Sequence, residues 1–268
     1  MKMKEMVTKF IGITGSKKSG KTTTIEYLTP KLIEKGLNVG SVKIAFKDVN
    51  IDVNKEHYDV ERLRNAKSVK TLFKSRIDTT IFYNKVMTLR EALKEFSKGL
   101  DLVLIEGFQE DLIGFPQIAM LKEKNQEKEI INDYTVAISS IPEFSIESKK
   151  DNFVNFNKLV DIIEKKALPL IPSLDCKHCG YENCITLVKE IIKGNNKIED
   201  CIIVQSEKAH LVLQLNEKNI PCNPFVQEVL KNTILGIIKT LKIEEKEISE
   251  IDIKILVNSK ETKEIFHE

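Results

Sequence analysis

Residues 9–22 read KFIGIT followed by GSKKSGKT, and this stretch decides the fold. The apolar run Lys9–Thr14 predicts a buried strand, and the helical spacing over 21–35 predicts a helix. Between them, Gly15–Thr22 matches the pattern G-x-x-x-x-G-K-[ST] in full. Its glycines let backbone N–H groups turn inward around a phosphate, and the helix amino terminus adds partial positive charge. The stretch therefore predicts a phosphate-binding loop between a strand and a helix.

Each part of this loop has an expected role in holding a nucleotide. Lys21 is expected to reach the β and γ phosphates, and its charge makes it a catalytic candidate. The Thr22 hydroxyl is expected to coordinate Mg²⁺, which takes few protein ligands. For Lys17 and Lys18, a solvated loop lysine is the simpler interpretation. The candidate phosphate-binding residues are Gly15, Ser16, Lys17, Lys18, Ser19, Gly20, Lys21, Thr22 and Thr23.

The second predicted part of the site follows the run Leu100–Ile105 (LDLVLI), which is typical of a strand covered on both faces. Glu106 and Gly107 then lie at the carboxyl end of a parallel strand, where such sheets bind ligands. Glu106 is a second catalytic candidate that could hold Mg²⁺ or orient an attacking water, and Gly107 would let the backbone pass close to the phosphates. The alternative interpretation of Glu106 is an acid that caps a buried strand. No strong general base is visible, so hydrolysis is expected to be slow.

Strands alternate with helices in the first half of the chain, which predicts an α/β fold with a mainly parallel sheet and helices on both faces. We expect a P-loop nucleotide-binding domain over 1–167, a cysteine-rich iron–sulfur module over 168–205 and a small α+β tail over 206–268. The stretch 168–173, with two prolines, predicts a linker. Further strands are predicted at 38–44, 69–73, 79–83, 117–121 and 134–139, and helices at 59–67, 88–97 and 157–166.

Composition excludes several classes of protein. The chain has 268 residues, 31% charged and 41% hydrophobic, with a formal net charge of +2. Residues 1–167 carry 29 basic and 24 acidic side chains and the remainder 13 and 16, so neither part has the concentrated cationic surface that nucleic-acid binding needs. No stretch approaches 18 uncharged apolar residues, so no membrane segment is expected. We expect a cytoplasmic protein.

A combination of stretches is more specific than the loop alone. Residues 12–53 read GITGSKKSGKTTTIEYLTPKLIEKGLNVGSVKIAFKDVNIDV. The combination also includes Asp59, Arg62 and Ala66 at their spacing, LVLIEGF at 102–108, and Phe115-Pro116-Gln117-Ile118. Together these stretches, over roughly residues 9–165, resemble the amino-terminal part of the molybdopterin-guanine dinucleotide biosynthesis protein B family.

The resemblance implies a GTP-binding P-loop protein, usually a homodimer, with weak GTP hydrolysis. Such a protein assists the guanylyltransferase that joins GMP to molybdopterin, which makes the cofactor of molybdenum or tungsten enzymes. Carried over by position, Gly15–Thr22 would hold the phosphates and Mg²⁺, and Glu106 would serve the metal or a water. Asp52, Asp59 and Arg62 would line the opening of the same loop, Asp52 as a further metal ligand and Asp59 and Arg62 as nucleotide-binding residues. For each of the two aspartates, a solvated loop carboxylate is an equal interpretation.

Two positions depart from the family pattern. Lys43-Ile44 stands where the family has Lys-His, so any role of that histidine is lost. Residues 116–119 read PQIA in place of Pro-Lys-Ile-Glu. One strand therefore lacks a cation and an anion that the family has. This weakens the expectation that the chain shares the family's substrate and leaves the expectation for its nucleotide unchanged.

Four of the five cysteines form a pattern typical of metal binding. Cys176, Cys179 and Cys184 follow C-x2-C-x4-C, and 16 residues separate Cys184 from Cys201. Such clustering in a cytosolic chain favours metal over disulfides, and four thiolates can hold a 4Fe–4S cluster. Zinc, which favours two close pairs, and unmetallated thiols are the alternatives. The segment resembles the iron–sulfur segment of corrinoid iron–sulfur proteins, and Cys222 is expected to be a small buried apolar residue.

The tail and the overall function have competing interpretations. The apolar helix predicted at 225–241, with strands at 210–215 and 250–257, is either a docking surface or packs against its own hairpin. The leading hypothesis is a GTP-binding accessory protein of molybdenum or tungsten cofactor maturation with an added 4Fe–4S cluster. The second is a redox coupler, in which the nucleotide gates electron delivery from the cluster to a metallocofactor or corrinoid enzyme. In the third hypothesis, the cluster only stabilises the fold of the small tail, and the chain is a binding scaffold.

Overall fold

A computed structural model of the chain describes residues 7–45, 58–66, 68–146, 152–171, 173–201, 204, 211, 213–215, 218–220, 222, 224–242, 251, 253 and 255. In the first part of the chain the elements are β1 (Lys9–Thr14), α1 (Lys21–Glu34), β2 (Val39–Lys43), α2 (Tyr58–Asn65), β3 (Lys70–Lys74), β4 (Thr79–Tyr83), α3 (Leu89–Phe96), β5 (Leu102–Glu106), β6 (Gln117–Met120), α4 (Glu127–Ile130), β7 (Thr135–Ser139) and α5 (Leu159–Lys166). After these come β8 (Leu168–Pro169), α6 (Cys184–Lys193), β9 (Leu213–Leu215), β10 (Lys218–Ile220) and α8 (Pro224–Ile238).

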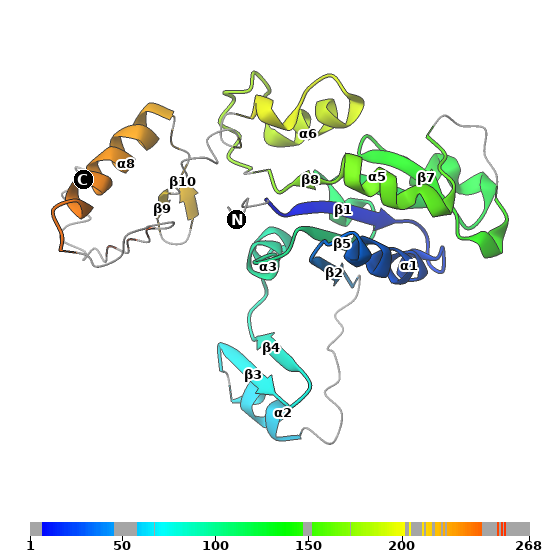
Figure 1. Cartoon of the computed structure of the whole chain (residues 1–268). Helices are drawn as coiled ribbons and strands as arrows, with labels where there is room; N and C mark the ends of the chain where they lie inside the picture. The colour runs from blue at the N-terminus through cyan, green and yellow to red at the C-terminus, as the bar shows by residue number, and fades with distance from the viewer. Residues whose placement is uncertain are drawn as a thin grey trace.

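The central element of the fold is a sheet with the strand order β2-β5-β1-β6-β7 (Figure 1). Every pairing along this order is parallel. Because β1 lies between β5 and β6, the loop that follows Thr14 leaves from the middle of the carboxyl edge of the sheet. The predicted α/β fold with a mainly parallel sheet is confirmed.

Helices cover both faces of this sheet, as the apolar strands require. Ile11 and Ile13 point to one face, where they pack with α1 and α5. Phe10 points to the opposite face and packs with Leu93 of α3. The alternation follows from the period of two along a strand, and it places a hydrophobic core on each side of β1.

The strands predicted at 69–73 and 79–83 form, but they do not join the central sheet. They are β3 and β4, which pair antiparallel as a separate two-stranded sheet. Only residues 75–78 connect them, and a connection this short cannot make the crossover that parallel strands need. Helix α2 packs against β3, and Figure 1 shows this unit set apart from the central sheet.

The stretch predicted as a linker begins inside the sheet. Leu168 and Pro169 form β8, which pairs antiparallel with the start of β1 through Phe10 and Lys9. Because β8 joins the amino end of β1, the residues after it enter the cysteine module from the edge of the sheet opposite to the phosphate-binding loop. The six residues of β1 span about 20 Å between the two edges, at about 3.3 Å for each residue.

The tail forms two of its predicted elements within the described residues. β9 and β10 pair antiparallel, and α8 covers Pro224–Ile238, close to the helix predicted at 225–241. Phe225, Val229 and Ile237 of α8 are exposed. Most of the strand predicted at 250–257 lies outside the described residues. Across the described ranges, no helix has the length and apolar character needed to cross a membrane.

Candidate functional site

The loop between β1 and α1 has a backbone that requires glycine at two positions. Gly15 has a φ of 142° and Gly20 a φ of 87°, values that other residues rarely adopt. A Cβ on Gly15 would lie 2.5 Å from the carbonyl oxygen of Met120, and one on Gly20 would lie 2.6 Å from Cγ2 of Ile141. Gly20 is also the N-cap of α1 and provides no capping side chain. The first N–H groups of α1 are therefore left for an anion.

Lys21 is directed back into this loop. Its Nζ donates hydrogen bonds to the carbonyl oxygens of Gly15 at 2.8 Å and Ser16 at 2.7 Å. Partial burial lowers the pKa of Lys21, the charge of Glu106 opposes this by raising it, and Lys43 lowers it further. The ammonium group thus lies in the cradle in which a phosphate would need a cation.

Glu106 joins three elements at the carboxyl edge of the sheet. One carboxylate oxygen accepts a hydrogen bond from Thr22 Oγ1 at 2.7 Å, and the other pairs with Lys43 Nζ at 2.9 Å. Strand register explains this arrangement, because Glu106 on β5 lies opposite Lys43 on β2 and Ile13 on β1. Glu106 is buried, so its charge acts close to Thr22 and to the loop.

The four predicted cysteine ligands line one pocket. Cys176, Cys179, Cys184 and Cys201 all border it, with Leu187 of α6 among the apolar residues around them. Burial raises the pKa of the Cys184 thiol, and hydrogen bonds from backbone N–H groups lower it. In the part of the chain that the structure describes, no three His, Cys, Asp or Glu side chains are gathered as closely as a single ion requires. The pocket therefore brings the four cysteines together around a shared space and not at one point.

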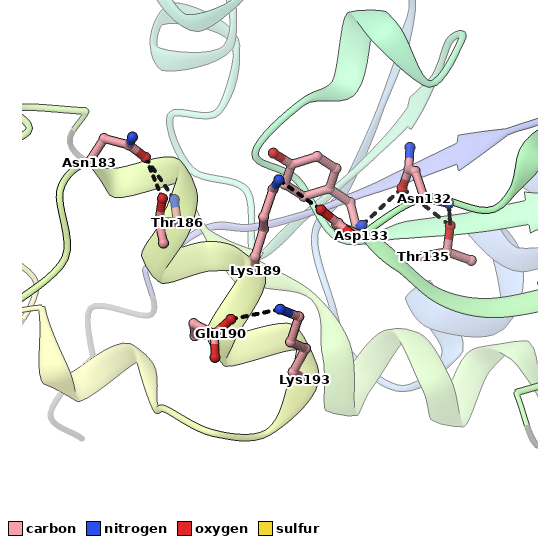
Figure 2. Close-up of polar contacts among 9 residues, drawn as sticks. Asn132, Asp133, Thr135, Asn183, Thr186, Lys189, Glu190 and Lys193 are labelled. Atoms are coloured by element: carbon pink, nitrogen blue, oxygen red, sulfur yellow. Dashed lines mark hydrogen bonds and ion pairs between the residues drawn. The ribbon is translucent and has the colours of Figure 1, made fainter.

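The loop before α6 is shaped for this pocket. Lys177 and Gly180 have positive φ values of 61° and 82°, and the N–H of Gly180 donates to the carbonyl oxygen of Lys177 at 2.9 Å. The N–H of Cys184, the first residue of α6, donates to the Asp175 carboxylate at 2.8 Å. Asn183 caps the helix by accepting a hydrogen bond from Thr186 (Figure 2). These contacts fix a tight turn between Cys176 and Cys184.

A polar and an apolar contact attach α6 to the nucleotide-binding half of the chain. Figure 2 shows Lys189 of α6 directed at Asp133, and the pair is 2.8 Å apart. Beside it, Tyr134 is buried with Cys184 and Val188. The ion pair lowers the pKa of Asp133 and raises the pKa of Lys189. Because Tyr134 directly precedes β7, the cysteine module is attached at the amino edge of the sheet.

Comparison with known proteins identifies the family. The profile of the family described as MobB, Molybdopterin guanine dinucleotide synthesis protein B, matches residues 10–141. A protein of Methanocaldococcus jannaschii is 34% identical over 235 residues, 87% of this chain and 91% of its own length, and is described as a "Putative molybdopterin-guanine dinucleotide biosynthesis adapter protein". This chain belongs to the MobB family.

Other matches cover separate parts of the chain. A molybdopterin-guanine dinucleotide biosynthesis adapter protein of Haemophilus influenzae is 30% identical over 159 residues, 58% of this chain and 86% of its own length. The crystal structure of Bacillus subtilis MobB is 22% identical and covers 59% of this chain and 98% of its own, with a TM-score of 0.48. Residues 171–203 match a separate family described as "Putative Fe-S cluster". The four pocket cysteines all fall within this second match.

Not every residue that the MobB resemblance assigned to the mouth of the loop lies near it. Asp59 and Arg62 are on α2, where they form an exposed ion pair at 3.6 Å, and Figure 1 shows α2 apart from the loop. The resemblance aligns positions but does not say where a separate helix–hairpin unit sits. Asp52 lies outside the described residues.

The remaining predicted residues are near the loop but differ in exposure. Lys17 and Lys18 are exposed on the loop, and Thr23 is exposed in the first turn of α1. Gly107 follows Glu106, and its N–H approaches the carbonyl oxygen of Ile13 at 3.4 Å. Cys222, predicted to be buried, is half-buried.

Two residues near the loop were not predicted from the sequence. Lys43 forms the ion pair with Glu106; its place near the end of a predicted strand indicates the carboxyl edge of the sheet, but its pairing with Glu106 follows from the strand order. Gln126 accepts hydrogen bonds from the N–H groups of Lys122 and Glu123 and lies 3.5 Å from Ser16 Oγ. No local pattern indicates Gln126, because its partner is more than a hundred residues away.

The residues of both sites fit the groups that the family and the cysteine pattern imply. In the nucleotide site, Ser19 Oγ is buried and has no hydrogen-bond partner within the described ranges. A buried polar group left unpaired is costly, which fits a ligand or water in the loop. Thr22 and Glu106 offer the hard oxygen donors that Mg²⁺ prefers. In the pocket, four thiols match the soft donor set of an iron–sulfur cluster.

Proposed function

We propose that this chain is a GTP-binding adapter of molybdopterin guanine dinucleotide biosynthesis, with slow Mg²⁺-dependent GTP hydrolysis and a 4Fe–4S cluster. Family membership supports the pathway and the nucleotide class. The juxtaposition of Lys21, Thr22 and Glu106 at the carboxyl edge of the sheet carries the proposal, because it supplies a phosphate cradle and a metal-binding carboxylate together.

The proposed roles follow from these positions. The N–H groups of Gly15–Thr22 and the Lys21 ammonium would bind the β and γ phosphates, with the buried Ser19 inside the loop and the exposed Lys17, Lys18 and Thr23 at its rim. Thr22 and Glu106 would hold Mg²⁺, which neutralises phosphate charge when bound. Hydrolysis would be slow because, among the described residues around the loop, Glu106 is the candidate base and both its oxygens are engaged.

The proposed partners follow from the family. As an adapter the chain would act with a molybdenum-cofactor guanylyltransferase or with a molybdenum or tungsten enzyme, as a cytoplasmic homodimer. We place the nucleotide-binding domain at 1–167, the iron–sulfur module at 168–205 and the α+β tail at 206–268, with the first strand of the module, β8, joining the sheet of the domain. In the module, Cys176, Cys179, Cys184 and Cys201 would ligate the cluster.

Nucleotide binding by the purified full chain tests the first part of the proposal. We expect Mg²⁺-GTP to bind more tightly than Mg²⁺-ATP and Lys21→Ala to weaken GTP binding at least tenfold. Lys9→Ala, at the opposite end of β1, is the control and should bind like the unaltered chain. GTP binding that survives Lys21→Ala unchanged would contradict the site.

Iron and acid-labile sulfide analysis after anaerobic purification tests the cluster, with zinc as the competing result.

A second function is favoured by the attachment of the cysteine module to the nucleotide-binding half. Tyr134 and Asp133 contact α6 directly, so a nucleotide-gated redox coupler has a physical connection between its parts. In that function the cluster would pass an electron to a metallocofactor or corrinoid enzyme. The test is the cluster's reduction potential and EPR signal with GTP, with GDP and without nucleotide. Identical values in all three states would exclude gating.

A further inference from the structure

Arginine is rare in this chain, and one arginine lies between the nucleotide-binding half and the cysteine module. The chain has 42 Lys and Arg residues, of which four are arginine: Arg62, Arg64, Arg76 and Arg90. Arg90 is in the first turn of α3, which packs on the central sheet. Its Nη1 donates a short hydrogen bond to the carbonyl oxygen of Ile171. Arg90 therefore reaches from α3 to the segment that leads into the cysteines.

The surroundings of Ile171 connect Arg90 with the pocket. Ile171 is buried and belongs to one apolar cluster with Tyr134, Cys184 and Val188. Cys184 in turn lines the pocket that the four cysteines share. The guanidinium group is thus held at the edge of the apolar cluster that contains Cys184, a proposed metal ligand.

Cys184, a proposed metal ligand that packs with Ile171, is the acidic group whose charge acts on Arg90. Partial burial lowers the pKa of Arg90, and the charge of Cys184 raises it. Within the described ranges, no carboxylate lies at ion-pair distance from Arg90. Because a partly desolvated cation without a counter-charge is unfavourable, a metal-bound thiolate at Cys184 would be a favourable neighbour for Arg90.

The other cations of the module are placed differently. Lys177 lies in the cysteine loop but is exposed, so water screens its charge. Lys189 of α6 is paired with Asp133. Of these three cations, Arg90 is the one that is both partly buried and without a carboxylate partner among the described residues, so solvent screens its charge least.

We propose that Arg90 is the counter-charge of the metal centre in the cysteine pocket and raises its reduction potential. The inference rests on the proposed iron–sulfur cluster. Four thiolates make such a cluster anionic, and when it accepts one electron from an external one-electron reductant its negative charge increases by one, with no bond formed or broken. A nearby fixed cation stabilises the more negative, reduced state, and net charge is one of the factors that set the potential.

The test is an EPR-monitored redox titration of the full chain, with dithionite as reductant and with iron and sulfide content measured on the same samples. Arg90→Gln removes the charge and Arg90→Lys keeps it. Lys94→Gln is the matched control, because it removes a charge from the exposed side of the same helix. We expect Arg90→Gln to disfavour the reduced state about tenfold, a lower potential by about 59 mV for one electron. Arg90→Lys and Lys94→Gln should stay close to the unaltered chain.

Each outcome decides whether Arg90 acts on the metal centre through its charge or only packs against its neighbours. A full cluster in Arg90→Gln with an unchanged potential would overturn the inference. If Arg90→Gln loses its iron, the inference requires Arg90→Lys to retain it, and loss of iron in both variants would assign Arg90 a packing role only. If the unaltered chain holds zinc without sulfide, the iron–sulfur proposal fails separately. The role of Arg90 is then decided by the zinc affinity. This affinity should be lower in Arg90→Gln and unchanged in Lys94→Gln.

Discussion

At the scale of single residues, the nucleotide site depends on a few atoms that cannot be moved. Gly15 has backbone atoms of Met120 against the position of a Cβ, and Glu106 has both carboxylate oxygens engaged. Lys21 combines partial burial with a positive charge. Each of these features makes a separate prediction about binding.

Gly15→Ala should abolish tight nucleotide binding. A non-glycine residue at positive φ costs about 1–2 kcal/mol, and here the neighbour in the way is a backbone carbonyl that cannot turn aside. Gly36→Ala is the matched control, since Gly36 also has a positive φ of 87° but faces open space. That control should lower stability by about 1 kcal/mol without changing affinity. Isothermal titration calorimetry and thermal unfolding separate the two effects, and equal affinities in both variants would contradict the assignment.

Lys43→Gln should strengthen Mg²⁺ binding in the presence of nucleotide. The Lys43 ammonium occupies one oxygen of Glu106 and repels a second cation, by about 1 kcal/mol for unit charges at 4 Å in water. We therefore expect the Mg²⁺ concentration at half-saturation to fall about fivefold. Lys74→Gln, on the separate β3–β4 hairpin, should change nothing. A higher Mg²⁺ concentration at half-saturation in Lys43→Gln would contradict this and would show that Lys43 supports the metal site.

Nucleotide affinity without Mg²⁺ should fall with rising pH earlier than an ordinary lysine would cause. Only the charged form of Lys21 attracts phosphate, and burial lowers the pKa at which that charge is lost. Glu106 raises this pKa, so Glu106→Gln should move the loss of affinity to still lower pH. Glu110→Gln, an exposed acid after β5, is the control. A pH profile that is the same in Glu106→Gln and the unaltered chain would contradict this coupling.

At the scale of elements, one short segment decides how the cysteine module is held. Asp133 and Tyr134 come just before β7 and contact α6, one by charge and the other by packing. The ion pair is partly exposed, so water screens it, whereas Tyr134 is buried. Packing of the tyrosine ring is therefore the larger part of the attachment.

Tyr134→Ala should release α6 from the sheet. Truncation of a buried aromatic side chain costs about 3 kcal/mol, and this ring packs against the helix that carries Cys184. We expect hydrogen exchange to accelerate in α6 while β5 in the central sheet stays protected. Tyr134→Phe keeps the ring and should behave like the unaltered chain. Full protection of α6 in Tyr134→Ala would show that other contacts hold the module.

At the scale of the whole molecule, the two sites lie at opposite edges of one sheet. The phosphate-binding loop follows the carboxyl end of β1, and β8, which leads into the cysteines, pairs with its amino end. The main cores on the two faces of the sheet contain α1, α5 and α3, and the cysteine pocket has an apolar cluster of its own. The nucleotide site should therefore not depend on the cysteines for its fold.

Removal of the metal should leave GTP binding intact. Chelation or oxidation of the cluster removes the metal that holds the four cysteine ligands together. We therefore expect α6 and the cysteine loop to lose protection from hydrogen exchange. The nucleotide affinity should change less than about threefold, because the cores around β1 exclude the pocket. A large loss of GTP binding would contradict the independence of the sites and favour coupling between them.

Local patterns predicted the elements that carry the nucleotide site, because each is written in consecutive residues. The loop Gly15–Thr22, the strand that ends at Glu106 and the helix before Gly36 were all correctly placed. The cysteine spacing is likewise a local pattern, and the structure brings all four cysteines to one pocket. Asp59 and Arg62 were placed at the mouth by resemblance alone, and the structure puts their helix with the β3–β4 hairpin.

Contacts between distant residues could not be read from the chain. The pairing of Lys43 with Glu106 depends on β5 lying between β1 and β2, and the approach of Arg90 to Ile171 depends on how α3 packs. Hydrophobic periodicity shows which side of an element is buried but not which element covers it. Residue order thus specified the chemistry of each site, whereas packing chose the neighbours that tune it, because burial and charge act through space and not along the chain.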